Sequence, residues 1–260
     1  MSYQIPTLSV IIVSWNVNKL LDDCLYSLKN ALLGVEAETF VVDNASSDAS
    51  PQMVIQKYPW VHLISNSENL GFGNANNQAI KLCRGKYLLL LNPDTIVPRG
   101  VIQAMISFLN DNQQAGLVGP EQCDTNGRIN YNNLVHWSPR ESGECLIERF
   151  ASFGQRSTRI LFPKPRQVPI INAGCWILRR EAIDQVGLFD EDMFLFGEEY
   201  DYCRRLKRAG WEIWFLRDLK IIHYRRQSLR QIGLLNEIRI CIQSLLIWLK
   251  KVFEQSLSII

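Results

Sequence analysis

Short apolar runs alternate with longer segments of helical spacing along the first part of the chain. The runs are rich in β-branched residues and predict buried strands at 8–15, 39–43, 61–66 and 86–92. The segments between them repeat apolar residues every three or four positions, which predicts helices at 17–33, from about 50 onward, 72–83 and 98–110. Strands that alternate with helices are typical of an α/β fold with a mostly parallel sheet covered on both faces.

The alternation loosens beyond about residue 120. The stretch TNGRINYNN (125–133) is rich in turn residues, and residues 139–167 show no clear period. The segment VPIINAGCWILRR (168–180) resumes an apolar strand. The sequence contains no internal repeat or low-complexity tract.

The C-terminal segment, residues 231–260, carries a helical apolar stripe. Apolar residues stand at 234, 235, 238, 241, 242, 245, 246, 249, 252 and 253, and Ile240, Ile247 and Trp248 widen the stripe. This spacing predicts an amphipathic helix. Lys250 and Lys251 interrupt the apolar stretch and argue against a membrane-spanning helix. Three interpretations stay open: packing on the rest of the chain, binding to a membrane surface through 234–253, or a homodimer contact.

Composition adds little to this picture. Of 260 residues 47% are hydrophobic and 21% charged, as in ordinary globular proteins, and a net charge of +2 does not indicate a nucleic-acid partner. The seven cysteines form no C-x-x-C pair, which favours reduced, buried thiols in a cytoplasmic protein. The start, MSYQIPTLSVIIVSW, has no basic segment or cleavage site, so we expect a first strand rather than a signal peptide.

Polar residues follow three of the predicted strands. They are Ser14, Trp15 and Asn16 after the first, Asp43 and Asn44 after the second, and Asn92 and Asp94 after the fourth. One such cluster is explained by a helix cap or an Asx turn. Ligands of parallel sheets bind where the strands end, however, so three clusters together predict one binding crevice.

Common nucleotide and hydrolase motifs are missing from the sequence. NLGFGNANN contains Gly71 and Gly73 without a third glycine and follows a loop, so it is no dinucleotide fingerprint. The sequence has no G-x-x-x-x-G-K-[ST], no G-x-S-x-G and no paired-histidine zinc motif. A P-loop protein, an α/β-hydrolase and a zinc peptidase are therefore disfavoured.

A group of three carboxylates stands in FLFGEEYDYCRRLKRAGW (194–211). If a helix begins near Glu198, its dipole stabilises the negative charge of Glu198 and Glu199. Asp201 precedes Arg204 and Arg205 by three and four residues, so it could form an ion pair on the helix surface. It could equally bind an acceptor hydroxyl.

Six motifs in order resemble those of family 2 glycosyltransferases, closest to the rhamnosyltransferase-like branch. They are SVIIVSWN, VVDNASSD, ENLGFGNANNQAI, LLLNPDT, NAGCWILRREAIDQVGLFDEDMFLFGEEYDYCRRLKRAGW and IIHYRRQS. The resemblance implies a GT-A fold with a Rossmann-like sheet. The catalytic domain would span 1–230, with a nucleotide-sugar half at about 1–120 and an acceptor half at about 121–230. It also implies an inverting transferase that uses a nucleotide-sugar donor with Mn²⁺ or Mg²⁺.

The resemblance assigns the donor-binding residues. Asp43 matches the carboxylate that accepts from the ring N–H of uracil or thymine, and Ser14, Trp15, Asn16 and Asn44 stand in the neighbouring donor motifs. Asp94 matches the last carboxylate of the family's D-x-D metal motif. This chain has Asn92-Pro93-Asp94, so Asn92 offers an amide oxygen without charge to the metal or the ribose.

The resemblance also assigns a second metal ligand, His223. It stands 24 residues after Glu199, the distance that the family motif implies, whereas an isolated histidine after a strand is more often structural. With two oxygen donors it would favour Mn²⁺ over Mg²⁺. Arg225 and Arg226 would then reach the donor diphosphate, or else form a solvated or membrane-facing charge.

The acceptor side follows from the G-E-D-x-D stretch of the family. Its second acid is the catalytic base, which here is Glu199, a glutamate in place of aspartate. Asp201 would orient the acceptor or the base, and Glu198, Ala173 and Gly174 would line the acceptor or sugar pocket, with Gly174 giving the donor close access.

The branch resemblance suggests rhamnose from dTDP-rhamnose as donor, with a UDP-sugar as the other choice. A saccharide or lipid-linked acceptor of a cell-surface polysaccharide would place the enzyme in the cytoplasm or at the inner face of the cell membrane. The alternative is a catalytically silent nucleotide-sugar-binding protein of the same fold, which the Asn92 and Glu199 departures permit. A nucleotide-sugar pyrophosphorylase would need a glycine-rich, lysine-bearing loop after the first strand, and VSWNVNK does not supply one.

Overall fold

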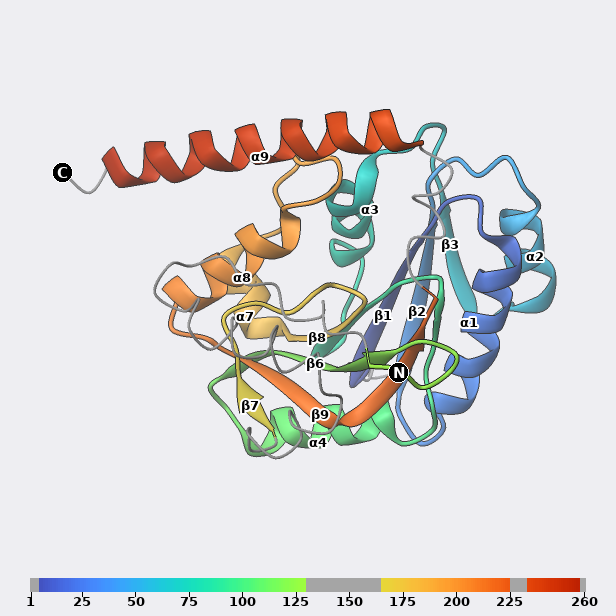
Figure 1. Ribbon diagram of the computed structural model, residues 1–260. Helices are drawn as coiled ribbons and strands as arrows, with labels where there is room; N and C mark the ends of the chain where they lie inside the picture. The colour runs from blue at the N-terminus through green and yellow to red at the C-terminus, as the bar shows by residue number, and fades with distance from the viewer. Residues whose placement is uncertain (1–4, 130–164, 225–232, 258–260) are drawn as a thin grey trace.

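The computed structural model describes residues 5–129, 165–224 and 233–257. Within them, one mixed sheet (Figure 1) contains β1 Leu8–Ser14, β2 Ala37–Asp43, β3 Val61–Ser65, β4 Tyr87–Leu91, β5 Thr95–Ile96, β6 Ala115–Cys123, β7 Arg166–Gln167, β8 Cys175–Arg179 and β9 Glu212–His223. The helices are α1 Asn18–Ala31, α2 Ser50–Lys57, α3 Gly71–Ile80, α4 Val101–Asp111, α7 Arg180–Val186, α8 Glu198–Arg208 and α9 Leu234–Leu257. The strand order is β3-β2-β1-β4-β8-β6-β9-β5, with β7 paired to β9.

The N-terminal half of the sheet is parallel. β3, β2, β1 and β4 run in one direction, in a register that places Ser14 opposite Asp43 and Asp43 opposite Ser65. β8 lies antiparallel between β4 and β6, and β9 runs parallel to β6. The predicted α/β architecture is therefore confirmed. The strand predicted at 168–180 is shorter than its apolar run, because a turn at Ala173 and Gly174 precedes it.

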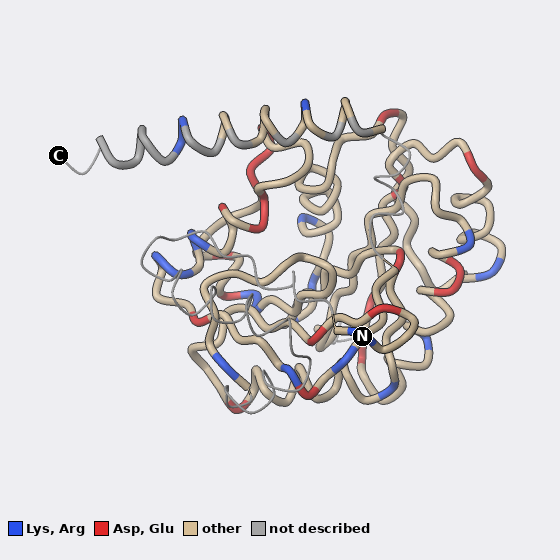
Figure 2. Tube along the Cα trace, viewed as in Figure 1, with Lys and Arg blue, Asp and Glu red and all other residues tan. Residues whose placement is uncertain are grey.

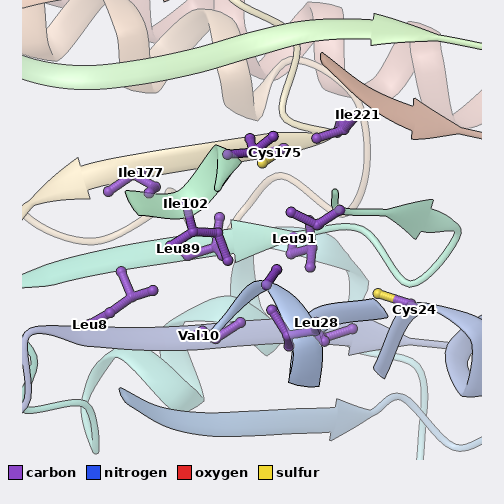
Figure 3. Packing of buried hydrophobic residues seen from close by; sticks show 14 of the residues in the cluster. Leu8, Val10, Cys24, Leu28, Leu89, Leu91, Ile102, Cys175, Ile177 and Ile221 are labelled. Atoms are coloured by element: carbon purple, nitrogen blue, oxygen red, sulfur yellow. The ribbon is translucent and has the colours of Figure 1, made fainter. Parts of the chain in front are cut away.

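Each face of the sheet carries its own core. Helices α1, α2 and α4 cover one face, and α3, α7 and α8 cover the other. Val10 and Ile12 of β1 pack in the first core, whereas Ile11 packs in the second. Figure 3 shows Val10 with Leu28 of α1 and Leu89 of β4 in the first core. A strand that is buried on both faces needs consecutive apolar residues, which explains the unbroken run in this strand.

Asp48 holds the start of two helices. Its Oδ1 accepts a hydrogen bond from the backbone N–H of Ser50 at 3.0 Å, and its Oδ2 accepts one from Asn18 N–H at 2.9 Å. The free N–H groups at the starts of α1 and α2 thus share one carboxylate. Both helices are thereby fixed next to the ends of β1 and β2.

The predicted C-terminal helix is present as α9, which lies over α3 and the loop before α8 (Figure 1). Ser244 Oγ donates to the carbonyl of Leu195 at 2.7 Å. Lys251 Nζ donates to Asp190 Oδ1 and to Asp192 Oδ2, both at 2.6 Å. These contacts hold α9 against the loop before α8. In the part of the chain that the structure describes, no helix is both long and apolar enough to cross a membrane.

Candidate active site

Six of the strand ends at one edge of the sheet carry the candidate site residues. β1, β2, β4, β6 and β9 end there, and the antiparallel β8 begins there. The residues at or directly next to these ends are Ser14, Asp43, Asn92, Gln122, Gly174 and His223. The structure therefore brings the three polar clusters of the sequence to one edge and adds residues from β6, β8 and β9.

Two short loops close the first part of this edge. Asn16 has a positive φ of 53°, its Oδ1 accepts from Ser47 N–H at 2.7 Å, and its own N–H donates to Ser46 Oγ at 2.9 Å. Asp43 Oδ2 accepts from Ser46 N–H at 3.0 Å. Trp15, beside Asn16, is half-buried. The loops after β1 and β2 are thus bonded to one another without a ligand, so their shape is preorganised.

Two buried oxygen atoms at the ends of these strands have no hydrogen-bond partner among the described residues. They are Asp43 Oδ1 and Ser14 Oγ. Buried polar atoms are normally paired, because an unpaired one costs about 1–3 kcal/mol. An N–H donor from a ligand base would satisfy Asp43 Oδ1, which fits the role that the sequence resemblance assigns to this residue.

Asn44 is used by the protein itself. Its Nδ2 donates to Asn69 Oδ1 at 3.2 Å and to Gly71 O at 3.0 Å, and its Oδ1 accepts from Asn66 Nδ2 at 2.9 Å. The side chain joins the end of β2 to the segment before α3. These bonds give Asn44 a structural role, and its contact with the donor nucleotide stays a prediction.

Asp94 and His223 form the centre of the edge. β5 pairs antiparallel with the end of β9, so that Thr95 stands opposite His223, and Tyr224 N–H donates to Asp94 O at 2.9 Å. Asp94 Oδ1 lies 3.0 Å from His223 Nε2, and Asn92 Nδ2 lies 3.3 Å from the same nitrogen. The three predicted metal or donor residues therefore meet, although more than 120 positions separate the histidine from the other two.

The Asp94–His223 pair fits a divalent cation. Two neighbouring ligands of an octahedral ion, each about 2.1 Å from the metal, lie about 3 Å apart. The observed 3.0 Å agrees with that spacing. The described residues contain no group of three or more His, Cys, Asp and Glu that could hold a metal by themselves. Oxygen atoms of the donor would have to complete the coordination.

Gly174 lies directly against the histidine. A Cβ at this position would stand 2.6 and 2.8 Å from the amide atoms of Gln122 and 2.8 Å from His223 Nδ1. The Gly174 carbonyl accepts from Asn92 N–H at 3.1 Å. The Gln122–His223 pair is therefore one reason for a glycine here, and the expected close access of the donor stays a prediction.

Glu198 and Glu199 begin α8, as the sequence predicts. The two residues before them, Phe196 with φ 67° and Gly197 with φ 98°, are both left-handed and turn the chain into the helix. For a phenylalanine this conformation costs about 1 kcal/mol or more, and such strain is concentrated at functional sites. The turn directs the start of α8, with its positive dipole end, to the two carboxyl groups.

Burial raises the pKa of both glutamates. Glu198 is only 4% exposed, and its Oε2 has no hydrogen bond to any described residue. Desolvation, followed by the charge of Glu199, raises its pKa to about 8. Glu199 is half-buried, and desolvation raises its pKa, opposed by backbone hydrogen bonds from itself, Ala173 and Gly197. Ala173, predicted to line the sugar pocket, is thus next to Glu199. A carboxylate with a raised pKa is suited to accept a proton near neutral pH.

Asp201 lies one turn further along α8. Its Oδ2 accepts from Arg205 Nε at 2.8 Å, and Arg205 Nη1 also donates to the carbonyl of Val186 at 2.7 Å. The ion pair that the sequence spacing suggested is therefore confirmed. The role of Asp201 in orienting the acceptor or the base stays a prediction.

Part of the predicted acceptor half lies outside the described residues. Arg225 and Arg226 follow directly after Tyr224, the last described residue beyond β9, and segment 130–164 is likewise outside. The predicted contact of the two arginines with a diphosphate, and the division of the catalytic domain near residue 120, therefore stay predictions.

Comparison with known proteins identifies the family. The model of glycosyl transferase family 2 matches residues 9–187, well over half of the chain. The chain belongs to glycosyl transferase family 2. An N-acetylglucosaminyl-diphospho-decaprenol L-rhamnosyltransferase from Mycobacterium tuberculosis is 28% identical over 239 residues, which cover 85% of this chain and 77% of that protein. The predicted family, its rhamnosyltransferase-like branch and the enzyme class, a glycosyltransferase, are therefore confirmed.

Solved glycosyltransferase structures share the fold. The mannosyltransferase PcManGT from Pyrobaculum calidifontis, in complex with GDP-Man and Mn²⁺, is 18% identical with a TM-score of 0.63 and covers 95% of this chain. GalNAc-T7 with UDP, GalNAc and Mn²⁺ is 17% identical with a TM-score of 0.63 and covers 85%. The chain spans 65% and 44% of these two structures, respectively. At this identity the likeness confirms the GT-A fold and no more.

One residue of this family 2 glycosyltransferase was missed by the sequence analysis. Gln122 lies near the end of β6 and is 1% exposed, with its side chain against His223. The sequence feature that could have indicated a strand ending near Gln122 was the run AGLVG at 115–119, which precedes the polar residues of PEQC. Two glycines and a proline made this run a poor strand candidate.

Proposed function

We propose that this family 2 glycosyltransferase is an inverting, metal-dependent enzyme that transfers rhamnose from dTDP-rhamnose to a lipid-linked acceptor of a cell-surface polysaccharide. The observation that carries the proposal is the 3.0 Å approach of Asp94 Oδ1 and His223 Nε2 at the same sheet edge as Asp43. A cation held there would lie where a diphosphate is expected if Asp43 holds the base. The likeness to a rhamnosyltransferase supports the choice of sugar.

The donor would be held from the loops after β1 and β2. Asp43 Oδ1, which has no partner in the described residues, accepts a ring N–H of thymine or uracil. A base that has a bare acceptor at this place is rejected, because two lone pairs would then face each other. Trp15 and Asn16, in the loop bonded to Ser46 and Ser47, line the nucleotide.

The metal would be held by Asp94 and His223, with Asn92 beside them, and by oxygen atoms of the diphosphate. Mn²⁺ or Mg²⁺ supplies positive charge that lowers the energy of the departing diphosphate. The imidazole ligand favours Mn²⁺. Arg225 and Arg226 would add to the same charge.

Glu199 acts as the general base. The residue is half-buried, and desolvation raises the pKa of its carboxyl group above the ordinary 4.5. It takes the proton of an acceptor hydroxyl as that oxygen attacks the anomeric carbon from the face opposite the diphosphate. The bond from the anomeric carbon to the diphosphate oxygen breaks, dTDP leaves, and the anomeric configuration is inverted.

Glu198 has a different role from its neighbour. It is nearly covered and protonated at neutral pH, since its pKa is about 8. A neutral carboxyl group can donate a hydrogen bond. Because Glu198 already carries a proton, it is not the base, and it is assigned to the acceptor or sugar pocket instead.

The acceptor is proposed from a relative whose printed name contains a diphospho-decaprenol, a sugar-diphosphate on a long lipid. The polar head of such a lipid stays at the membrane surface. An enzyme that uses it with a soluble nucleotide sugar would work at the inner face of the cell membrane.

Calorimetric titration tests the donor site. dTDP and UDP are titrated with and without Mn²⁺ into the wild type, Asp43→Ala and Asp94→Asn, and transfer from dTDP-rhamnose is followed on a lipid-diphosphate-linked sugar. We expect Mn²⁺-dependent binding of dTDP that both variants weaken by 10-fold or more, and transfer with inversion. A wild type that binds neither nucleotide at millimolar concentration would contradict the proposal and favour a silent protein of this fold.

A further inference from the structure

The outer face of α9 exposes a continuous apolar stripe. Leu235, Ile238, Ile242 and Leu246 recur every three or four residues, and their exposed fractions are 83%, 47%, 52% and 60%. Residues at this spacing lie on one side of a helix. Single exposed apolar residues are common, but a contiguous row of four indicates a binding surface.

Two anchors on the opposite side fix the rotation of the helix. Ser244 is 3% exposed and donates to Leu195 O, and Lys251, two turns later, binds Asp190. Ser244 stands two residues from both Ile242 and Leu246, which places it about 200° around the helix from them. The stripe therefore points away from the rest of the protein.

Positive charge accompanies the stripe. Arg239 and Lys250 are exposed, and a spacing of eleven residues, close to three full turns, puts them on the same flank. Figure 2 shows basic positions along α9 and acidic positions in the segment beneath it. Residues 225–260 contain six basic and two acidic residues. An apolar stripe with a cationic flank fits an anionic bilayer surface, where the apolar side chains enter below the headgroups.

A second copy of the chain fits this face less well. A stable dimer interface takes roughly 20–30 residues from each partner, and the stripe offers four. We propose that the outer face of α9 docks in the plane of an anionic membrane. The inference rests on the proposed function for its use: the inner face of the same helix holds the loop before Glu198 and Glu199, so docking would place the acid pair near the head of a lipid-linked acceptor.

Vesicle sedimentation tests the surface. The full chain is mixed with vesicles of phosphatidylcholine alone or of equal amounts of phosphatidylcholine and phosphatidylglycerol. The variant Ile242→Asp/Leu246→Asp is compared with Asn236→Asp/Gln243→Asp, which adds the same charge at exposed polar positions outside the stripe. We expect the wild type to bind the anionic vesicles, the stripe variant to bind at least 10-fold more weakly, and the control to lie between them.

Two results would overturn the docking surface. One is equal sedimentation of the wild type and the stripe variant. The other is a lipid-free wild-type dimer, seen by analytical ultracentrifugation, that the stripe variant converts to a monomer. Calorimetric binding of dTDP to each variant separates this failure from that of the proposed function: a protein that binds vesicles but no nucleotide keeps the surface and loses the transferase proposal.

Gln122 contacts Nδ1 of His223, the ring nitrogen that does not face Asp94. His223 Nδ1 lies 2.7 Å from Gln122 Oε1. The Gln122 Nε2 lies 3.5 Å from the carbonyl of Asn172, which can only accept, so the amide oxygen faces the ring. An amide oxygen is an acceptor, and Nδ1 must therefore carry the proton. In the neutral ring, Nε2 then keeps its lone pair on the side of Asp94 Oδ1.

The geometry points to Gln122 as a positioning residue that selects the imidazole tautomer. Asn92 Nδ2, a donor 3.3 Å from Nε2, favours the same tautomer. In the neutral ring, the lone pairs of Nε2 and Asp94 Oδ1 then face each other, with 3.0 Å between the two atoms. A cation bound by both atoms would stabilise this arrangement. This inference rests on the proposed metal site.

Two measurements test the tautomer of His223 and the proposed metal site independently. ¹⁵N NMR of the neutral His223 ring in the metal-free protein reads which nitrogen carries the proton, and Mn²⁺ titration with dTDP, followed by electron paramagnetic resonance, reads affinity. Gln122→Glu keeps an acceptor oxygen, Gln122→Met removes it, and Gln114→Met is an exposed control.

We expect the Nδ1–H form in the wild type, about 10- to 100-fold weaker Mn²⁺ binding in Gln122→Met, and near wild-type binding in Gln122→Glu and the control. A wild-type ring protonated at Nε2, or unchanged Mn²⁺ affinity in Gln122→Met, would overturn the inference. If the wild type binds no Mn²⁺ yet shows the Nδ1–H form, the tautomer role stands and the proposed metal site falls.

Discussion

The candidate active site has two sides: the predicted nucleotide side, at the loops after β1 and β2, and the acid side, at the start of α8. The two sides are held in different ways. On the nucleotide side, the loops after β1 and β2 bond to one another, as in the 2.7 Å bond between Ser47 N–H and Asn16 Oδ1. On the acid side, the loop before α8 is held from two distant elements. Phe72 N–H of α3 donates to Phe194 O at 2.9 Å, and Lys251 of α9 binds the loop from above.

Close packing makes the acid side dependent on distant residues. A Cβ on Gly71 would stand 2.1 Å from Phe194 O, and Asn77 makes hydrogen bonds to both the N–H and the carbonyl of Phe189, each at 2.9 Å. These partners are more than 100 positions apart in the sequence. The comparison teaches that the loops after β1 and β2 are held by bonds to one another, whereas the loop before α8 is held by contacts with α3 and α9.

Removing the proposed base should impair transfer without affecting the nucleotide side, and we expect this to be the largest effect. Glu199→Gln keeps the shape but accepts no proton, so we expect transfer to fall about 10²–10⁴-fold while calorimetric dTDP binding stays unchanged. Wild-type transfer should rise with pH through an apparent pKa above the ordinary 4.5, because the base must lose its proton and burial raises its pKa.

Glu199→Asp serves as the matched variant, since it retains a carboxylate that is one methylene shorter. It should keep more activity than Glu199→Gln and the same rise with pH. Equal rates for the glutamine variant and the wild type would assign the proton to another group.

The next largest difference should appear when one carboxylate is neutralised on each side and nucleotide binding is compared. Asp94→Asn should weaken Mn²⁺-dependent dTDP binding by about 10- to 100-fold, because it removes the charge of one of the two proposed protein ligands of the metal. Asp201→Asn should leave nucleotide binding within about 2-fold, since it loses only a pair with Arg205 on α8. Calorimetry reads both, and an equal loss in the two variants would refute the separation of the sides.

Glu198→Gln should change stability with pH. The folded pKa of about 8 lies above the ordinary 4.5, so between these values the folded state keeps a proton that the unfolded state releases. Wild-type stability therefore falls as the pH rises from about 5 to 8, and the glutamine variant escapes this loss. We expect the variant to match the wild type near pH 4 and to be about 1–3 kcal/mol more stable at pH 8, measured by urea unfolding. A difference independent of pH would argue against the buried proton.

The smallest effect should come from loosening the α9 anchor. Lys251→Met removes the contacts with Asp190 and Asp192, and we expect the KM for the acceptor to rise about 3-fold, with a stability loss of about 0.5–1 kcal/mol. Lys57→Met removes a surface pair with Asp22 of equal length, 2.6 Å, on the nucleotide side. Steady-state kinetics should show no change in acceptor KM for this control, and a rise in both would indicate a general effect of lost charge.

Much of the nucleotide side could be predicted from the sequence. The strands ending at Ser14, Asp43 and Leu91 follow from apolar runs that stop at polar residues, and the start of α8 at Glu198 follows from its acidic first turn. The strand that carries Gln122 could not be predicted, because AGLVGPEQC is rich in residues that disfavour strands and forms β6 only between β8 and β9.

The sequence by itself determined the order of strands and helices, the polar ends of the strands and the family, because these depend on local periodicity and on motifs in a fixed order. Only the tertiary structure decided the 3.0 Å approach of Asp94 to His223, the burial that raises the pKa of Glu198, and the reason for Gly174. Each of these depends on distances between atoms far apart in the chain. Such distances are set by strand pairing and side-chain packing, which no local pattern encodes.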